Sequence, residues 1–252
     1  MFSLERKSNI NIQNFTTIES QYGRFIVNRH CAFQAESLIK TGLPHIQDEL
    51  NKILAVINNL PEDSVVVDAG ANIGLVAIPI AQLLAQKNGV VHAFEVQRMM
   101  SYALCGTAAL NDLENVIVYN QALGSAEGTL NAGKLDYGKP QDFGLFSLVD
   151  QDDKNSESIK VTTIDKLNLP RLDFFKIDVE GMEIDVLKGS RQSLEDYLPW
   201  CWIEYWKVNI DDIKAQFAGL DYKFFIMDQL NMLCAPVSKL TESPLTINAK
   251  EA

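Results

Sequence analysis

Several features that mark common classes of protein are missing from this sequence. Its 4 cysteines show no C-x-x-C spacing, so we predict neither a zinc ribbon nor a disulfide framework, and we expect a reducing, cytoplasmic environment. No apolar leader follows the first residues, and the longest nearly apolar run, 75–85, is too short to cross a bilayer. No internal repeat is visible.

Positive charge is also scarce. The chain has 22 Lys and Arg against 33 Asp and Glu, which gives a formal net charge of -11. Nucleic acids and anionic lipid surfaces are bound mainly through Lys and Arg, so we expect neither a nucleic-acid nor a membrane partner. The hydrophobic fraction of 47% is ordinary for a globular chain with a sizeable core.

Residues 64–74 combine an apolar run, a carboxylate and a glycine turn, in the order Ser-Val-Val-Val-Asp-Ala-Gly-Ala-Asn-Ile-Gly. The β-branched valines predict a strand buried on both faces of a parallel sheet, with Asp68 at its carboxyl end. Gly70 and Gly74 suit a tight turn, and we expect Asn72 to cap the helix that follows. Free N–H groups at such a turn favour a nucleotide-type ligand, although similar turns occur in α/β proteins that bind none.

The spacing of the glycines indicates which class of nucleotide the turn binds. A dinucleotide fingerprint reads G-x-G-x-x-G, and its second glycine lets the backbone approach the pyrophosphate. Asn72 occupies the position of that glycine, which favours a sulfonium nucleoside over a pyrophosphate. The next predicted strand, 90–95, ends on Glu95, near the offset of roughly 20 residues at which an acid accepts ribose hydroxyl protons. Asn120 and Gln121 follow a third strand, and we predict that they receive the amino group of adenine.

The domain organisation follows from the same alternation of strands and helices. We predict an N-terminal extension over 1–59, a central domain over 60–240 and a loosely attached tail over 241–252. The segment 124–160 interrupts the alternation with four glycines and an acidic cluster, so it is either a substrate lid or an insert. The segment contains aromatic and hydroxyl side chains that favour a lid, because aromatic rings suit a sugar or another flat apolar substrate. These residues are Tyr137, Phe143, Phe146 and Ser147.

Two further strands, predicted over 172–178 and 198–206, also end near acids. Asp178 and Glu180 follow the first, and Glu204 lies at the end of the second. A carboxylate at such an edge can accept a proton from a substrate hydroxyl if desolvation raises its pKa. Alternatively, the three acids could hold a divalent cation, which we consider the weaker interpretation, and Glu180 could simply favour the first turn of its helix.

These stretches together resemble the FkbM family of S-adenosylmethionine-dependent methyltransferases, a Rossmann-like class. The resemblance covers about residues 60–205 and departs from the family pattern at Val96, where proline is common. The motifs that carry it are Val-Asp-Ala-Gly-Ala-Asn-Ile-Gly at 67–74, Ala-Phe-Glu at 93–95, Thr-Thr-Ile-Asp at 162–165, Lys-Ile-Asp-Val-Glu-Gly-Met-Glu-Ile-Asp-Val-Leu-Lys-Gly at 176–189, Pro199 and Ile203-Glu204.

The resemblance implies an α/β fold with a doubly wound, mostly parallel sheet of seven strands, the last one reversed. It implies S-adenosylmethionine as cofactor and transfer of its methyl group to a hydroxyl of a small-molecule or carbohydrate acceptor. The turn residues Asp68, Gly70, Asn72 and Gly74 would hold the amino-acid end of the cofactor, and Glu95 its ribose.

Two other functions remain open at this point. An NAD-dependent oxidoreductase is disfavoured by Asn72, and a catalytically silent cofactor-binding protein is disfavoured by the three intact acids. For the transferase we assign Asp178 first as base or orienting group, with Glu180 and Glu204 as further catalytic candidates. We predict no metal ligand.

Overall fold

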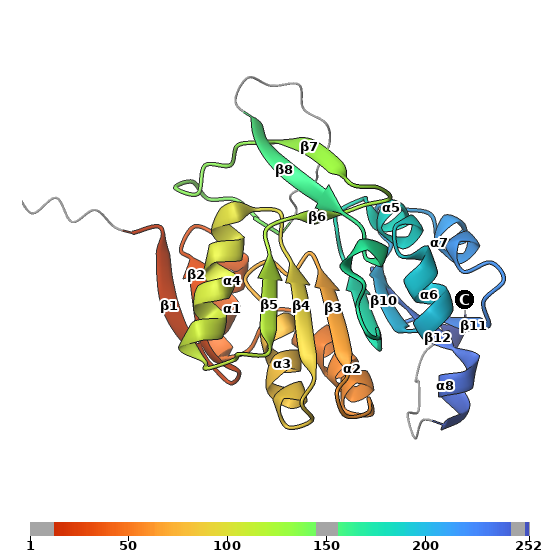
Figure 1. Cartoon of the computed structure of the whole chain (residues 1–252). Coiled ribbons are helices and arrows are strands. Elements are labelled where there is room, and N and C mark those ends of the chain that lie inside the picture. Colours follow the sequence, from red (N-terminus) through yellow and green to blue (C-terminus); the bar gives the residue numbers. More distant parts are fainter. Residues whose placement is uncertain (1–12, 145–155, 243–249, 252) are drawn as a thin grey trace, which may run out of the picture.

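The computed structural model describes residues 13–144, 156–242 and 250–251 (Figure 1). Its centre is a sheet of 8 strands in the order β13-β11-β12-β10-β9-β3-β4-β5. The strands are β3 (Val65–Ala69), β4 (Val90–Phe94), β5 (Val116–Tyr119), β9 (Phe174–Ile177), β10 (Trp200–Glu204), β11 (Tyr222–Ile226), β12 (Asn231–Pro236) and β13 (Lys250–Glu251).

The expected mostly parallel, doubly wound sheet is confirmed. Strands β5, β4, β3, β9 and β10 pair parallel to one another, whereas β12 lies antiparallel between β10 and β11. This reversed strand is the one expected for a seven-stranded methyltransferase sheet. The two-residue strand β13 pairs with β11 and brings the total to 8.

Helices cover both faces of the sheet because the unalternated strands send apolar side chains to both sides. Val66 belongs to a cluster with α1 (Ala32–Thr41), α2 (Gln47–Ile57), α3 (Ala77–Ala85) and α4 (Arg98–Leu110). Val65 and Val67 belong to the opposite cluster, with α5 (Glu183–Lys188), α6 (Arg191–Tyr197) and α7 (Ile210–Gln216). In the part of the chain that the structure describes, no helix combines the length and hydropathy needed to cross a bilayer.

Smaller elements surround the sheet. The hairpin β1 (Phe15–Ser20) and β2 (Gly23–Asn28) contacts α4. The strands β6 (Ala122–Leu123), β7 (Gly128–Gly133) and β8 (Ser156–Thr162) form a second sheet beyond the carboxyl ends of β3, β4 and β5 (Figure 1). The 3-10 turn η1 (Asp165–Leu167) follows β8, and α8 (Val237–Glu242) follows β12.

Two parts of the predicted domain organisation lie at least partly outside the residues that the structure describes. Phe146 and Ser147, which we assigned to a substrate lid, lie outside the described residues, as does most of the tail 241–252. The described parts of 124–160 contribute β7 and most of β8, which pair antiparallel.

The helix after the glycine turn begins later than predicted. Gly70, Asn72 and Gly74 have φ angles of 82°, 50° and 90°, so the backbone through this turn is not helical. The helix α3 begins at Ala77, and Asn72 therefore does not cap it. Pro79 lies in the first turn of α3, where no intrahelical N–H is needed.

Candidate active site

A cavity of about 340 Å³ opens at the carboxyl ends of β3, β4, β9 and β10. Parallel sheets place ligands at this edge, where the strand order reverses direction around β3. Residues from α1 and α2 and from the segment 142–144 complete the lining. The predicted site residues in the lining are Asp68, Gly70, Asn72, Glu95, Gln121, Asp178, Glu180 and Glu204.

The glycine turn lies directly against the end of β9. A Cβ atom added at Gly70 would lie 1.7 Å from the carbonyl oxygen of Asp178, and the φ of 82° there also favours glycine. Only glycine therefore allows the turn after β3 to approach the acid that follows β9. This contact joins the cofactor motif to the catalytic candidates.

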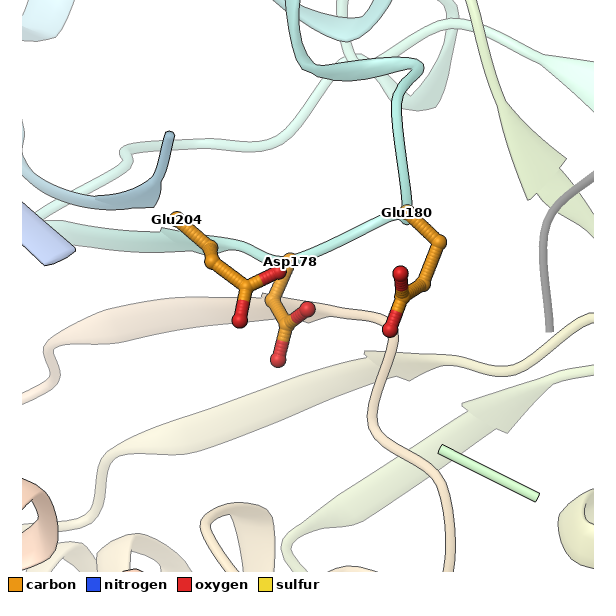
Figure 2. A group of neighbouring side chains, drawn as sticks. All are labelled: Asp178, Glu180 and Glu204. Carbon is orange, nitrogen blue, oxygen red and sulfur yellow. The ribbon is translucent and has the colours of Figure 1, made fainter. Parts of the chain in front are cut away.

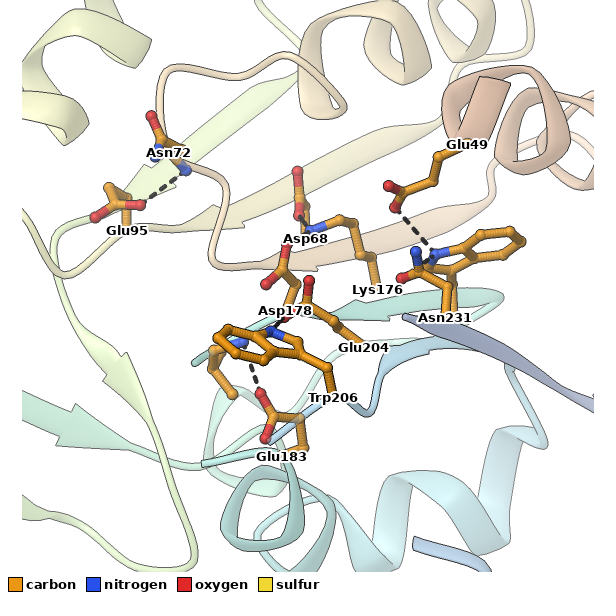
Figure 3. Close-up of polar contacts among 12 residues, drawn as sticks. Glu49, Asp68, Asn72, Glu95, Lys176, Asp178, Glu183, Glu204, Trp206 and Asn231 are labelled. Carbon is orange, nitrogen blue, oxygen red and sulfur yellow. Dashed lines mark hydrogen bonds and ion pairs between the residues drawn. The ribbon is translucent and has the colours of Figure 1, made fainter. Parts of the chain in front are cut away.

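Glu95 is held by backbone donors on both of its carboxylate oxygens. The Asn72 N–H donates to Oε2 at 2.7 Å (Figure 3). The Gln97 N–H donates to Oε1 at 2.6 Å. Burial raises the pKa of Glu95 to about 7, against the opposing effect of these two hydrogen bonds. Each oxygen keeps a second lone pair, so the carboxylate can still accept a pair of ligand hydroxyls.

Gly74 and Asn120 are the two predicted site residues that the cavity lining does not include. A Cβ at Gly74 would lie 2.4 Å from Cδ1 of Leu104, so the glycine permits α4 to pack on the turn. The Asn120 amide donates to the carbonyl oxygens of Glu95 and Val96 at 2.8 and 3.0 Å. Asn120 thus braces the backbone after β4, and only Gln121 of the predicted amide pair borders the cavity.

Lys176 is a buried cation on β9 between two acids. Its Nζ lies 3.0 Å from Oδ2 of Asp178 and 3.5 Å from Oδ1 of Asp68 (Figure 3). Burial lowers the pKa of Lys176, but Asp178, Asp68 and Glu49 outweigh it, so the pKa stays above the ordinary value. Burial raises the pKa of Asp68, and Lys176 opposes that shift.

Asp178, Glu180 and Glu204 lie together, with one carboxylate oxygen from each within 4.8 Å of the others. Figure 2 shows all three side chains pointing to the same side of the chain. Burial and the negative charge of Asp178 raise the pKa of Glu204 to about 9, so Glu204 is protonated at neutral pH. Its Oε2 accepts a hydrogen bond from Nε1 of Trp206 at 2.7 Å.

Glu180 precedes α5 in a left-handed conformation, with a φ of 58°. Its carboxylate pairs with the ammonium of Lys207. The first turn of α5 is instead occupied by Glu183, whose Oε1 accepts the N–H groups of Val179 and Gly181 at 3.2 and 3.0 Å. The alternative role predicted for Glu180, at the helix start, therefore falls to Glu183.

The three clustered acids have the oxygen ligands that a divalent cation prefers. Each already contacts a donor of its own: Asp178 contacts Lys176, Glu180 contacts Lys207, and Glu204 contacts Trp206. A cation at this position would compete with those contacts. Comparing the activity with and without a chelator therefore tests whether this cluster holds a metal ion.

Sequence reasoning missed Glu49, which reaches the same cavity from α2. Its Oε1 accepts a hydrogen bond from Nε1 of Trp202 at 3.1 Å. Burial raises the pKa of Glu49 to about 7, while Lys176 partly opposes this shift. The apolar residues of 45–60 recur with a helical period, which identifies the buried face of the helix but not that Glu49 reaches the cavity.

The raised pKa of Glu49 predicts a pH-dependent stability difference for Glu49→Gln. The native state binds the Glu49 proton more tightly than the unfolded state, so the wild type loses stability as pH rises from about 4.5 to about 7. Glutamine does not ionise. The Tm of the variant minus that of the wild type should rise over this pH range and then level off.

Thermal unfolding at half-unit steps from pH 4.5 to 8 measures this difference. Asp48→Asn, at an exposed position on the same helix, serves as the control and should show a flat difference. A difference for Glu49→Gln that stays flat, or that falls with pH, would show that the pKa of Glu49 is not raised in the folded protein.

The comparison with protein families decides which class this site belongs to. The methyltransferase FkbM domain matches residues 68–229, more than half of the chain. The chain belongs to the FkbM methyltransferase family. The match includes both the glycine turn and the strand ends that carry the three acids, so the predicted family is confirmed, and it implies S-adenosylmethionine as cofactor.

Individual relatives agree with this FkbM assignment. Methyltransferase sdnD of Sordaria araneosa is 29% identical over 186 residues, covering 60% of this chain and 70% of that protein. The crystal structure of methyltransferase FkbM from Methylobacillus flagellatus KT superposes with a TM-score of 0.50 at 18% identity. That match covers 69% of this chain and 44% of the other, so this FkbM protein spans less than half of that relative's length and shares its fold.

Proposed function

We propose that this protein transfers a methyl group from S-adenosylmethionine to a hydroxyl of a small-molecule or carbohydrate acceptor. The observation that carries the proposal is that one cavity contains both Glu95 and the acid pair Asp178 and Glu204. A methyl donor bound between them would present its reactive carbon to a placed base.

The cofactor end of the cavity fits an adenosyl sulfonium with an amino-acid tail. Glu95 offers two free lone pairs to a ribose, as described above. Asp68 is fully buried, and among the described residues neither of its carboxylate oxygens accepts a hydrogen bond, although Lys176 lies 3.5 Å away. Such an acid suits the ammonium of the tail. When bound, the cofactor supplies an electrophilic methyl group.

The acceptor end contains two carboxyl groups, that of Asp178 next to the ammonium of Lys176 and that of Glu204, whose pKa is raised. Asp178 would accept the proton of the acceptor hydroxyl, and the cofactor would supply the methyl group that this oxygen takes up and keep the bonding electrons on its sulfur. Burial raises the pKa of Glu204 and a hydrogen bond to Asp178 adds to this shift, so Glu204 keeps its proton at neutral pH and helps to orient Asp178. Lys176 fixes the position of Asp178, and Glu49 borders the same space.

Apolar side chains at the mouth suit a ring-bearing acceptor. Phe33 and Leu230 line the cavity and are exposed, and Trp206, which contacts Glu204, is 47% exposed. An exposed indole next to carboxyl groups can stack on a sugar or aryl ring while the acids bind its hydroxyls. We therefore place the acceptor between Trp206 and Asp178.

The proposed division of the chain follows these roles. The central domain 60–240 provides the cofactor motif and the acids, and the extension 1–59 contributes Glu49 and Phe33 to the acceptor side. Within 124–160, Asp142 and Gly144 line the cavity, which supports a covering role for this segment. We retain cytoplasmic residence and the absence of a nucleic-acid partner as expectations from composition.

A screen for methyl incorporation from labelled S-adenosylmethionine tests the proposal. Sugars, aryl alcohols and aliphatic polyols serve as acceptors, each with and without chelator, and the product linkage is determined by mass spectrometry. We expect O-methyl products that form equally well with chelator. Loss of activity with chelator would assign the acid cluster to a metal, and N- or C-methyl products would contradict the proposal.

Glu95→Ala should chiefly weaken cofactor binding. It removes a pair of charge-assisted hydrogen bonds to the ribose, which is worth about a 100-fold loss of affinity for S-adenosylmethionine. Isothermal titration calorimetry measures this loss, with the exposed Glu114→Ala as the control. If the affinity of the Glu95 variant were unchanged, the ribose could not lie at this edge.

A further inference from the structure

Gln97 is a buried amide with one satisfied and one unsatisfied end. It stands at the N-cap of α4, two positions after Glu95, and borders the cavity. Its Nε2 donates to the carbonyl oxygen of Phe143 at 2.5 Å. Its Oε1 is buried, and among the described residues it has no hydrogen-bond partner.

The orientation of this amide is determined by its neighbour. If the oxygen and nitrogen were exchanged, two acceptor oxygens would face each other at the Phe143 carbonyl. Oε1 is therefore the end left without a donor. A buried acceptor without a donor is costly, and in native structures such groups are normally satisfied by a bound molecule or an ordered water.

Glu95 shows which part of the ligand lies at this end of the cavity. The backbone N–H of Gln97 donates to Glu95 at 2.6 Å, so the Gln97 residue and the predicted ribose acid are in direct contact. The adenosyl part of the cofactor offers hydroxyl and amino donors. The ammonium of the amino-acid tail is assigned to Asp68, at the end of β3.

We infer that Oε1 of Gln97 accepts a hydrogen bond from the adenosyl part of the cofactor, while Nε2 of the same amide holds residues 142–144 over the cavity. This inference rests on the proposed function and adds a cofactor-binding residue to it.

The segment that Gln97 holds is anchored from its other side as well. The Phe143 ring is buried and stacks on Tyr137 with centroids 5.1 Å apart. The Asn28 amide donates to the Tyr137 carbonyl at 3.0 Å, and the Asn72 amide lies 3.5 Å from the Phe143 carbonyl. Phe143, which we had assigned to acceptor binding, thus packs in the core and positions the covering segment.

The test is calorimetric binding of S-adenosylhomocysteine and of 5′-methylthioadenosine, which lacks the amino-acid tail, to Gln97→Leu. We expect both ligands to lose about tenfold to a hundredfold in affinity, because the substitution removes one buried hydrogen-bond acceptor for the ligand. Gln82→Leu is the matched control, since that amide also donates to a backbone carbonyl, at 2.9 Å, but does not line the cavity. It should bind both ligands like the wild type.

Asn28→Ala separates the direct bond from the anchoring of the covering segment. It removes the contact to Tyr137 without touching the cavity, so the affinity should fall by less than about threefold. An equal loss in Asn28→Ala would assign the whole effect to anchoring and overturn the direct bond.

Two further results would overturn the inference: an unchanged affinity of Gln97→Leu for both ligands, or a loss confined to S-adenosylhomocysteine. If the wild type itself bound neither ligand, the proposed function would fail first.

Discussion

Asp178→Asn is expected to lower kcat by about 10² to 10⁴-fold, which is the usual contribution of a general base. Asparagine keeps the shape of the side chain but cannot accept the proton of the acceptor hydroxyl. Affinity for S-adenosylmethionine should stay within about threefold of the wild type, because the cofactor contacts that we propose lie at Glu95, Asp68 and the glycine turn. Single-turnover rates and calorimetric affinities measure the two effects separately.

Glu204→Gln is the matched control for this experiment. Glu204 is protonated at neutral pH because its pKa is raised to about 9, so glutamine reproduces both its charge and its shape. We expect kcat to fall by less than about tenfold. A larger loss in Glu204→Gln than in Asp178→Asn would exchange the roles of the two acids.

Lys176→Met should have the largest effect on stability. Lys176 is 3% exposed and lies beside Asp178 and Asp68, so methionine leaves two acids without their cation. Removal of one partner of a buried ion pair costs about 3 to 5 kcal/mol in the free energy of unfolding. The loss should increase with pH, because the fully buried Asp68, whose pKa burial already raises, is then forced to ionise without its cation.

Urea unfolding at pH 5 and pH 8 measures this loss. Lys40→Met is the control, because Lys40 pairs with Glu36 on the exposed surface of α1 and its removal should cost about 1 kcal/mol or less. Equal unfolding midpoints for wild type and Lys176→Met would show that the buried cation does not stabilise this edge of the sheet.

Much of the fold follows from local patterns in the sequence. The strand predicted over 90–95 corresponds to β4, and the strand predicted over 172–178 corresponds to β9. The helix after the turn was misplaced because Asn72 adopts a left-handed φ of 50°, which a capping residue would not. Propensity does not reveal such a conformation, because the contacts between the turn and β9 determine it.

The candidate residues that follow strands could be predicted from the sequence. Those brought to the cavity by contacts between distant segments could not. Asp68, Glu95, Asp178 and Glu204 could be placed together because parallel strands end at one edge. Glu49 depends on a hydrogen bond to Trp202, 153 positions along the chain, and no spacing indicates this.

Side-chain direction was the second source of error. Asn120 follows its strand as predicted, yet its amide is directed to the backbone of the neighbouring loop. Lys176 lies within the motif that carries the family resemblance, but its role as the shared cation becomes apparent only when both neighbouring acids are placed.

A crystal structure with S-adenosylhomocysteine tests the central claim most directly. We predict electron density for the ligand in the cavity at the carboxyl ends of β3 and β4, with its ribose hydroxyls at Glu95 and its sulfur facing Asp178. Density at another surface, or a ribose on the far side of the sheet from Glu95, would contradict a shared cofactor and acceptor site at this edge.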